Sequence, residues 1–375
     1  MTEPSRRAPQ LPRRPDAAQL PYHRCPEAPM PFARRPLSPV RRRAAQALAV
    51  TGAAALLLTG CGSSGSSSAG SSSASAGSSS AASPAADAGG GGNGGKRTVK
   101  DATGKAVEVP AEPKRIVTLT QEDLDAVLAL GAKPVGITNG QGLGEPPAYL
   151  KDRVQGVPVV GNLLQPVMDK VIAAKPDLIL AGDLQDEQVL KQLREITPAT
   201  LVTMAPTDDW KLAFRGIGNA VNKLDQANKV IGDYEAKAAK AGGELGKNKG
   251  AAVSVVRWNP TGPSWMEKKQ FASGVALDMG LTRPAAQDKD GNAHSPALSL
   301  EKLAEIDGDW LFLSTLTDDG KAALKDVQSK PAYQELDAVR NNRTVTVDGS
   351  VWSTRGGPLA ADAVIGDITK ALGGS

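Results

Sequence analysis

Histidine and cysteine are nearly absent from this 375-residue chain, which has two of each. The histidines are His23 and His294, and the cysteines are Cys25 and Cys61. His294 is thus the only residue of either type after position 95, which excludes a multi-histidine metal site, a disulfide framework and a Cys–His catalytic pair from that part. The sequence also lacks a P-loop and a nucleophile elbow. We therefore expect neither catalytic activity nor a resident cofactor or metal.

Large apolar side chains are missing from residues 62–95, which consist almost entirely of Ser, Ala and Gly. Such a segment cannot bury enough apolar surface to offset the entropy lost on ordering. We therefore predict that residues 61–95 form a flexible linker.

An excess of basic residues is also missing from the C-terminal part, despite the net charge of +4. Ten of the 44 basic residues and only three acids precede Cys61, so the remainder carries 34 basic and 37 acidic residues. Its net charge of about −3 gives no indication of nucleic-acid binding.

The basic segment has the order of a signal peptide. Arg41, Arg42 and Arg43 precede an apolar run over 44–58, which is shorter than the roughly 20 residues of a membrane span. The run ends in Leu-Thr-Gly-Cys61, which resembles a bacterial lipobox. We predict a signal peptide over 1–60, or over 30–60 if Met30 is the true start, and acylation (palmitate) of Cys61, whose chains would anchor the protein to the membrane.

The remaining residues alternate short β-rich runs with helical patterns, which favours an α/β fold with parallel sheets. Strands are expected at 115–120, 135–137, 157–161, 178–181, 200–204, 252–256, 310–313 and 344–347, and helices at 122–130, 168–174, 187–195, 271–279, 300–306, 330–336 and 362–372. A proline-free helical pattern over 208–246 interrupts the alternation. We expect an N-terminal lobe over 96–222, an inter-lobe helix over 223–249 and a C-terminal lobe over 250–375.

Several motifs resemble those of the periplasmic-binding-protein family that serves siderophore, haem and cobalamin importers. They are Pro-Lys-Arg-Ile-Val at 113–117, Leu-Gly-Ala-Lys-Pro-Val-Gly at 130–136, Lys-Pro-Asp-Leu-Ile at 175–179, Ser-Leu-Glu-Lys-Leu at 299–303, and Trp352 with Gly-Pro-Leu-Ala-Ala at 357–361. The resemblance implies a class III binding protein, with two lobes joined by one long helix. It also implies a monomeric lipoprotein on the extracytoplasmic face of the cell membrane that carries its ligand in the inter-lobe cleft to an ABC permease and its ATPase.

By motif position, the resemblance implies that Asp169 and Glu301 dock on the permease. The family usually has glutamate at the first of these positions, so Asp169 reaches one methylene less far. The alternative is that both are ordinary exposed acids at helix starts, where a carboxylate complements the helix dipole.

Ligand contacts are expected from the loops that follow strands in the C-terminal lobe. Trp258 and Trp265 lie on a stretch rich in turn residues, and Trp352 lies on another predicted loop, so we expect all three to form aromatic walls. Arg257 and Arg355 are expected to donate hydrogen bonds to ligand oxygens. Their alternatives are a structural ion pair for Arg257 and a capping role for Arg355.

Two further aromatic residues have two alternative roles each. Tyr149 is a candidate ligand contact or a packing residue, and Trp210 is left open between packing and the cleft rim.

The loop over 161–165 has no arginine, so we expect mainly neutral contacts from the N-terminal lobe. This composition favours a ferric siderophore of the hydroxamate type over a trianionic catecholate. The alternatives are haem, cobalamin or a non-transport lipoprotein of the envelope.

Overall fold

The computed structural model describes residues 95–373, and the predicted signal peptide, Cys61 and most of the linker lie outside them. The first lobe begins with an antiparallel pair, β1 and β2, and continues with two small sheets. Their order is β3-β7-β8 and β4-β5-β6. A parallel bridge between Val117 and Gly136 joins the two sheets. The strands are β1 (Lys96–Lys100), β2 (Ala106–Pro110), β3 (Ile116–Thr118), β4 (Ile137–Thr138), β5 (Val159–Asn162), β6 (Gln165–Pro166), β7 (Leu178–Leu180) and β8 (Thr200–Leu201).

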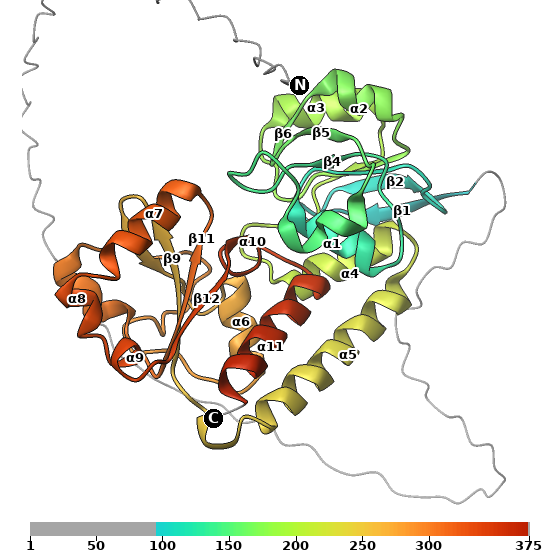
Figure 1. Ribbon diagram of the computed structural model, residues 1–375. Coiled ribbons are helices and arrows are strands. Elements are labelled where there is room, and N and C mark those ends of the chain that lie inside the picture. Colours follow the sequence, from blue (N-terminus) through green and yellow to red (C-terminus); the bar gives the residue numbers. More distant parts are fainter. Residues whose placement is uncertain (1–94, 374–375) are drawn as a thin grey trace, which may run out of the picture. The chain divides into compact units, whose positions relative to one another are not determined.

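The second lobe contains one sheet of order β10-β9-β11-β12, of which β9, β11 and β12 are labelled in Figure 1. Strands β9, β11 and β12 are parallel, and β10 is an antiparallel edge strand. These strands are β9 (Val253–Asn259), β10 (Gly262–Trp265), β11 (Trp310–Thr315) and β12 (Thr344–Asp348). Parallel strands with helices between them confirm the predicted α/β class.

Helices follow most of the strands. In the first lobe these are α1 (Gln121–Ala129), the 3₁₀ helix η1 (Ala148–Val154), α2 (Met168–Ala174), α3 (Glu187–Ile196) and α4 (Trp210–Ala220). In the second lobe they are α6 (Phe271–Asp278), η3 (Leu300–Ile306), α7 (Asp318–Val327), α8 (Pro331–Gln334), α9 (Asp337–Arg340), α10 (Gly349–Trp352) and α11 (Pro358–Leu372).

The two lobes are connected by α5 (Leu224–Gly243), which the short 3₁₀ helix η2 (Gly246–Asn248) follows. The helical pattern predicted over 208–246 is therefore not one continuous helix. Asn222 has a positive φ of 59°, and the chain turns there between α4 and α5. Asparagine tolerates this left-handed conformation better than most residues, which allows the break without glycine.

The last helix, α11, packs beside α5 and also contacts α1 of the first lobe (Figure 1). Asp125 on α1 is fully buried, and its carboxylate accepts the backbone N–H groups of Leu359 and Ala360, both at 2.9 Å. Those N–H groups lie in the first turn of α11, where no intrahelical partner exists. The buried carboxylate satisfies them and thereby joins the two lobes at a second place besides α5.

Candidate ligand-binding cleft

A cavity between the lobes has a volume of about 470 Å³. Its first-lobe wall is the chain after β8 and the start of α4, and its second-lobe wall is the start of α6 with the loop near Asn292. The lining residues are Met204, Thr207, Asp208, Asp209, Trp210, Lys211, Lys268, Lys269, Gln270, Phe271, Gly274, Leu277, Asp278, Asp290, Asn292, Arg355 and Gly356.

A smaller cavity of about 160 Å³ lies at the ends of first-lobe strands. It is lined by Thr120, Gln121, Glu122, Gln141, Leu163, Leu164, Asp183, Thr354 and Arg355. Loops after parallel strands are the usual ligand positions in α/β folds, so both cavities lie where the topology favours binding.

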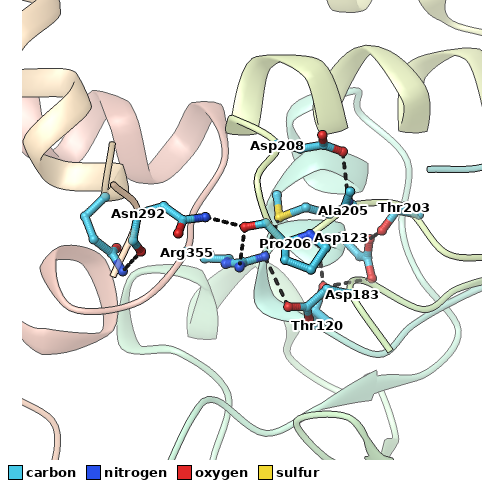
Figure 2. A network of polar contacts seen from close by, with 11 residues as sticks. Thr120, Asp123, Asp183, Thr203, Ala205, Pro206, Asp208, Asn292 and Arg355 are labelled. Atoms are coloured by element: carbon cyan, nitrogen blue, oxygen red, sulfur yellow. Dashed lines mark hydrogen bonds and ion pairs between the residues drawn. The ribbon is translucent and has the colours of Figure 1, made fainter. Parts of the chain in front are cut away.

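Arg355 borders both cavities and bonds to the opposite lobe. Its Nη1 lies 3.2 Å from Oδ2 of Asp183 and 2.8 Å from Sδ of Met204, and its Nη2 donates to the carbonyl of Pro206 at 3.4 Å. Asn292 Nδ2 donates to the same carbonyl (Figure 2). These contacts separate the two cavities and hold the lobes together across the cleft.

The backbone at the start of α1 is held by a buried carboxylate. Asp123 accepts the hydroxyl of Thr120 at 2.8 Å and that of Thr203 at 2.5 Å, so the loops after β3 and β8 are tied to one side chain (Figure 2). Burial raises the pKa of Asp123 to about 6, although the hydrogen bonds act in the opposite direction.

Glu122 follows at the wall of the smaller cavity and is half-buried. Loss of solvation raises the pKa of its carboxyl to about 7, with a smaller contribution in the same direction from Asp123. The guanidinium of Arg355 acts against this shift. The small cavity therefore contains a carboxyl group that titrates near neutral pH.

The cations of the large cavity are matched by acids. Lys211 lies 3.0 Å from Asp278, Lys268 lies 2.6 Å from Asp288, and Lys269 lies 3.2 Å from Asp290. Arg355 has Asp183 as its partner. In the described part of the chain, the cavity walls therefore offer no cation that lacks an acidic neighbour.

Two of the predicted aromatic walls are core residues instead. The stretch predicted as a loop forms the hairpin of β9 and β10, in which Trp258 is 3% and Trp265 is 4% exposed. Alternation along β9 directs Trp258 to the same side as Val256, into the hydrophobic core formed with η3, α7 and α8. Neither tryptophan lines a cleft cavity in this structure.

Trp352 is likewise buried, at 1% exposure, on α10 rather than on a loop. Its ring stacks on Phe312 with centroids 4.5 Å apart, and its indole N–H donates to Asp367 at 2.8 Å. A ring that is almost fully buried, with one face stacked on Phe312 and its N–H bonded to Asp367, cannot serve as a ligand wall here. The expected ligand role of Trp352 is therefore not supported by its position.

Of the two roles considered for Tyr149, ligand contact or packing, its position fits packing. Its hydroxyl donates to Asp125 at 2.9 Å and accepts from Gln121 Nε2 at 3.3 Å. The Gln121 amide also donates to Thr354 Oγ1 at 2.9 Å. Tyr149 thus belongs to the polar contact that joins α1 with the segment before α11.

The two predicted arginines differ in their surroundings. Arg355 reaches both cavities, whereas Arg257 lines neither. Arg257 is half-buried on β9, and its Nε has no hydrogen-bond partner among the described residues. Burial lowers the pKa of the Arg257 guanidinium. The structure thus brings only Arg355 of the predicted ligand residues to the cavities.

Of the other cavity residues, Trp210 was left open between packing and the cleft rim, and Asn292 was not predicted as a contact. Trp210 borders the large cavity and packs against Phe271 with ring centroids 6.3 Å apart. Its position just after the helix cap Asp209 was visible in the sequence, but its direction was not. Asn292 carried no sequence signal, because its role depends on Pro206, which is 86 residues away in the chain.

Asp169 and Glu301 are exposed, and both lie in the first turn of their helices, α2 and η3. Among residues 95–373, no group of three or more His, Cys, Asp or Glu is placed to hold a metal ion. Within the same range, no helix is both long and apolar enough to cross a membrane.

Comparison with known proteins gives consistent matches. The periplasmic binding protein family matches residues 116–351. The Bacillus subtilis protein named "Probable siderophore-binding lipoprotein YfiY" is 36% identical over 284 residues, covering 72% of this chain and 86% of the relative. The "Fe(3+)-citrate-binding protein YfmC" of the same organism is 27% identical and covers 73% and 85%, respectively.

Among solved structures, Staphylococcus aureus SirA complexed with staphyloferrin B is similar, with a TM-score of 0.65 and 25% identity. The match covers 74% of this chain and 98% of SirA. The chain therefore covers most of the length of these proteins.

Proposed function

Because this chain belongs to the periplasmic binding protein family, we propose that it binds a ferric siderophore in the cleft between its lobes and delivers it to an ABC importer. The observation that carries the proposal is the pair of inter-lobe cavities on either side of Arg355. Relatives whose names include siderophore-binding and ferric-citrate-binding support the ligand class.

The charge of the walls supports a neutral or weakly charged complex, with the hydroxamate type as the preferred ligand. The residues that line the large cavity include four cations and four acids, so its walls carry no net positive charge to attract a trianionic complex. Arg355 exchanges Asp183 for ligand oxygens, and Trp210 with Phe271 contacts the apolar skeleton.

A ferric carboxylate complex is the second candidate, because one relative is named for ferric citrate and SirA is complexed with staphyloferrin B. Haem and cobalamin are the other ligands of the family. The four classes differ in charge and shape, so one titration series separates them.

For delivery, we propose that acylated Cys61 anchors the protein on the extracytoplasmic face of the cell membrane and that residues 62–94 connect the lobes to it. Asp169 and Glu301 then contact the permease, whose ATPase drives import. The protein is proposed to act as a monomer.

The test is a titration of the purified full-length protein, followed by tryptophan fluorescence. Ferrioxamine, ferric citrate, a ferric catecholate, haem and cobalamin are added in separate experiments, with iron-free ferrioxamine as a control. Saturable quenching by ferrioxamine at submicromolar concentration supports the preferred ligand. Tight binding of another complex instead would mean that the ligand is of that class and not of the hydroxamate type. Binding of none of them contradicts the proposed function.

A further inference from the structure

The smaller of the two cavities is acidic, whereas the larger one is balanced in charge. Among the described residues that line the smaller cavity, Glu122 and Asp183 are acids and Arg355 is the only cation. The larger cavity is lined by four acids and four cations. Asp123 adds a third carboxylate at the same helix start, but it is fully buried and already accepts two hydroxyl groups. A positively charged ligand group is therefore best accommodated in the smaller cavity.

The charge balance of the smaller cavity depends on a single ion pair. Arg355 Nη1 lies 3.2 Å from Asp183 Oδ2 (Figure 2). Glu122 forms no ion pair within the part of the chain that the structure describes. When Arg355 turns to ligand oxygens, as in the proposed function, both half-buried carboxylates are left without a cation, which is unfavourable. A ligand that brings its own cation avoids this loss.

A buried amide in the same wall also lacks a donor. Gln121 lines the smaller cavity and is only 6% exposed. Its Nε2 donates to the carbonyl of Ser350 at 2.6 Å and to Thr354 Oγ1 at 2.9 Å, whereas its Oε1 has no hydrogen-bond partner among the described residues. A buried acceptor without a donor destabilises the site. An ammonium group, which has three N–H donors and no acceptor, is complementary to this oxygen and to the two carboxylates.

The size and lining of the smaller cavity fit the end of an alkyl chain. Its volume is about 160 Å³, which is room for about five heavy atoms at the roughly 30 Å³ of a water molecule. Leu163 and Leu164, both half-buried, give it an apolar side that methylene groups can contact. A whole ferric complex is too large for this cavity, whereas the larger cavity on the other side of Arg355 has about 470 Å³.

We propose that the smaller cavity binds the ammonium end of an alkylamine arm of the siderophore, with Glu122 and Asp183 as its counter-ions. Arg355 then turns to the oxygens around the iron, and the ferric centre occupies the larger cavity. The carrier therefore selects siderophores with a free amine over neutral ones that have the same ferric centre. This inference rests on the proposed function, because it takes a ferric siderophore as the ligand of the cleft.

Ionisation of Glu122 makes this selection dependent on pH. Loss of solvation raises the pKa of Glu122 to about 7, Asp123 and Asp183 act in the same direction, and Arg355 acts against them. A ligand ammonium favours the ionised carboxylate, so its binding releases a proton from Glu122. Affinity for a cationic ligand therefore rises between about pH 6 and about pH 8, whereas affinity for a neutral ligand shows no such rise.

The test compares ferrioxamine B, which has a terminal amine, with its N-acetyl derivative, which has the same ferric centre and no cation. Tryptophan fluorescence of the full-length protein is followed during titration with each probe at pH 6, 7 and 8. The variants are Glu122→Gln and Asp183→Asn, and thermal unfolding checks their fold. Glu305→Gln is the matched control, because Glu305 is also half-buried but lies on η3 and lines neither cavity.

At pH 8 we expect the parent protein to bind the amine probe about tenfold more tightly than the acetylated one, through charge-assisted hydrogen bonds. This preference should shrink at pH 6 and in both acid variants, and persist in Glu305→Gln. Equal affinity of the parent for the two probes, a comparison that needs no variant, overturns the amine site while the proposed function stands. Binding of ferric citrate in place of both probes has the same meaning, and binding of no ferric complex overturns both.

Discussion

Asp183 and Arg355 form an ion pair of 3.2 Å that joins the two lobes across the cleft. Asp183 follows β7 of the first lobe, and Arg355 lies between α10 and α11. Both residues line the smaller cavity, and Arg355 also reaches the larger one. A ligand that fills the cleft therefore meets a guanidinium that already has a partner, and binding requires an exchange of that partner.

Replacing Arg355 with Gln should weaken binding of the ferric complex about tenfold, which corresponds to about 1.4 kcal/mol. The reason is the loss of a cationic donor at the wall shared by both cavities. Fluorescence titration measures the effect. Arg194→Gln is the control, because Arg194 is also partly buried and pairs with Glu187 at 3.6 Å, but lies on α3. Equal affinity for parent and Arg355→Gln would remove Arg355 from the site.

Trp352→Phe should lower the free energy of unfolding by about 1–2 kcal/mol and leave ligand affinity unchanged. Phenylalanine keeps the contact with Phe312 but loses the indole hydrogen bond to Asp367. Urea unfolding and ligand titration on the same sample separate the two effects. Weaker binding at unchanged stability would restore Trp352 as a ligand contact.

Asp125→Ala should destabilise the protein by about 2–4 kcal/mol, because it leaves two N–H groups of α11 and the Tyr149 hydroxyl without an acceptor. Urea unfolding gives the value. Asp169→Ala serves as the control, since Asp169 is an exposed helix acid, and its effect should stay within about 0.5 kcal/mol. A similar, small effect for both variants would mean that water satisfies the end of α11.

Glu122→Gln should stabilise the protein by about 1–2 kcal/mol at pH 8 and have almost no effect at pH 4. The folded state raises the pKa of Glu122 from 4.5 to about 7, so it binds the proton more tightly than the unfolded chain does. The contribution of this group to stability is therefore largest below pH 4.5 and is lost as the pH rises through about 7. Glutamine never ionises and avoids this loss.

The measurement for this variant is urea unfolding of parent and Glu122→Gln at several values between pH 4 and pH 8. The expected change in stability is smaller than the pKa shift alone would give, because the Glu122 side chain is partly exposed and water screens its charge. Parallel stability curves for the two proteins would show that Glu122 titrates normally.

Local patterns in the sequence predicted the elements but not the long-range contacts. The helix predicted over 168–174 coincides with α2, because Lys-Pro ends it, and the strand at 178–181 coincides closely with β7. The prediction for the tryptophans failed where turn residues such as Pro260 suggested a loop, although the period of two in β9 placed Trp258 with Val256.

The contacts that define the cleft lie beyond such patterns. Asp125 meets Leu359 and Ala360 across more than 230 positions, and Arg355 meets Met204 across 151. No local spacing encodes these pairs, because they depend on how the lobes are oriented around α5. The sequence could therefore predict only those site residues that lie in a family motif or on a single loop.

The hydrogen bonds between Asp125 and α11 connect the two lobes a second time, so that the lobes and their connections form a closed ring. One side of the ring is α5, and the other is the contact of α1 with α11, so the lobes are attached at these two points in addition to the contacts of Arg355 across the cleft. A simple hinge about one pivot would break the second attachment, whereas a twist about the line through both preserves it. Gly142 of the first lobe lies close to Thr317 of the second, and such a twist would move these two residues past one another.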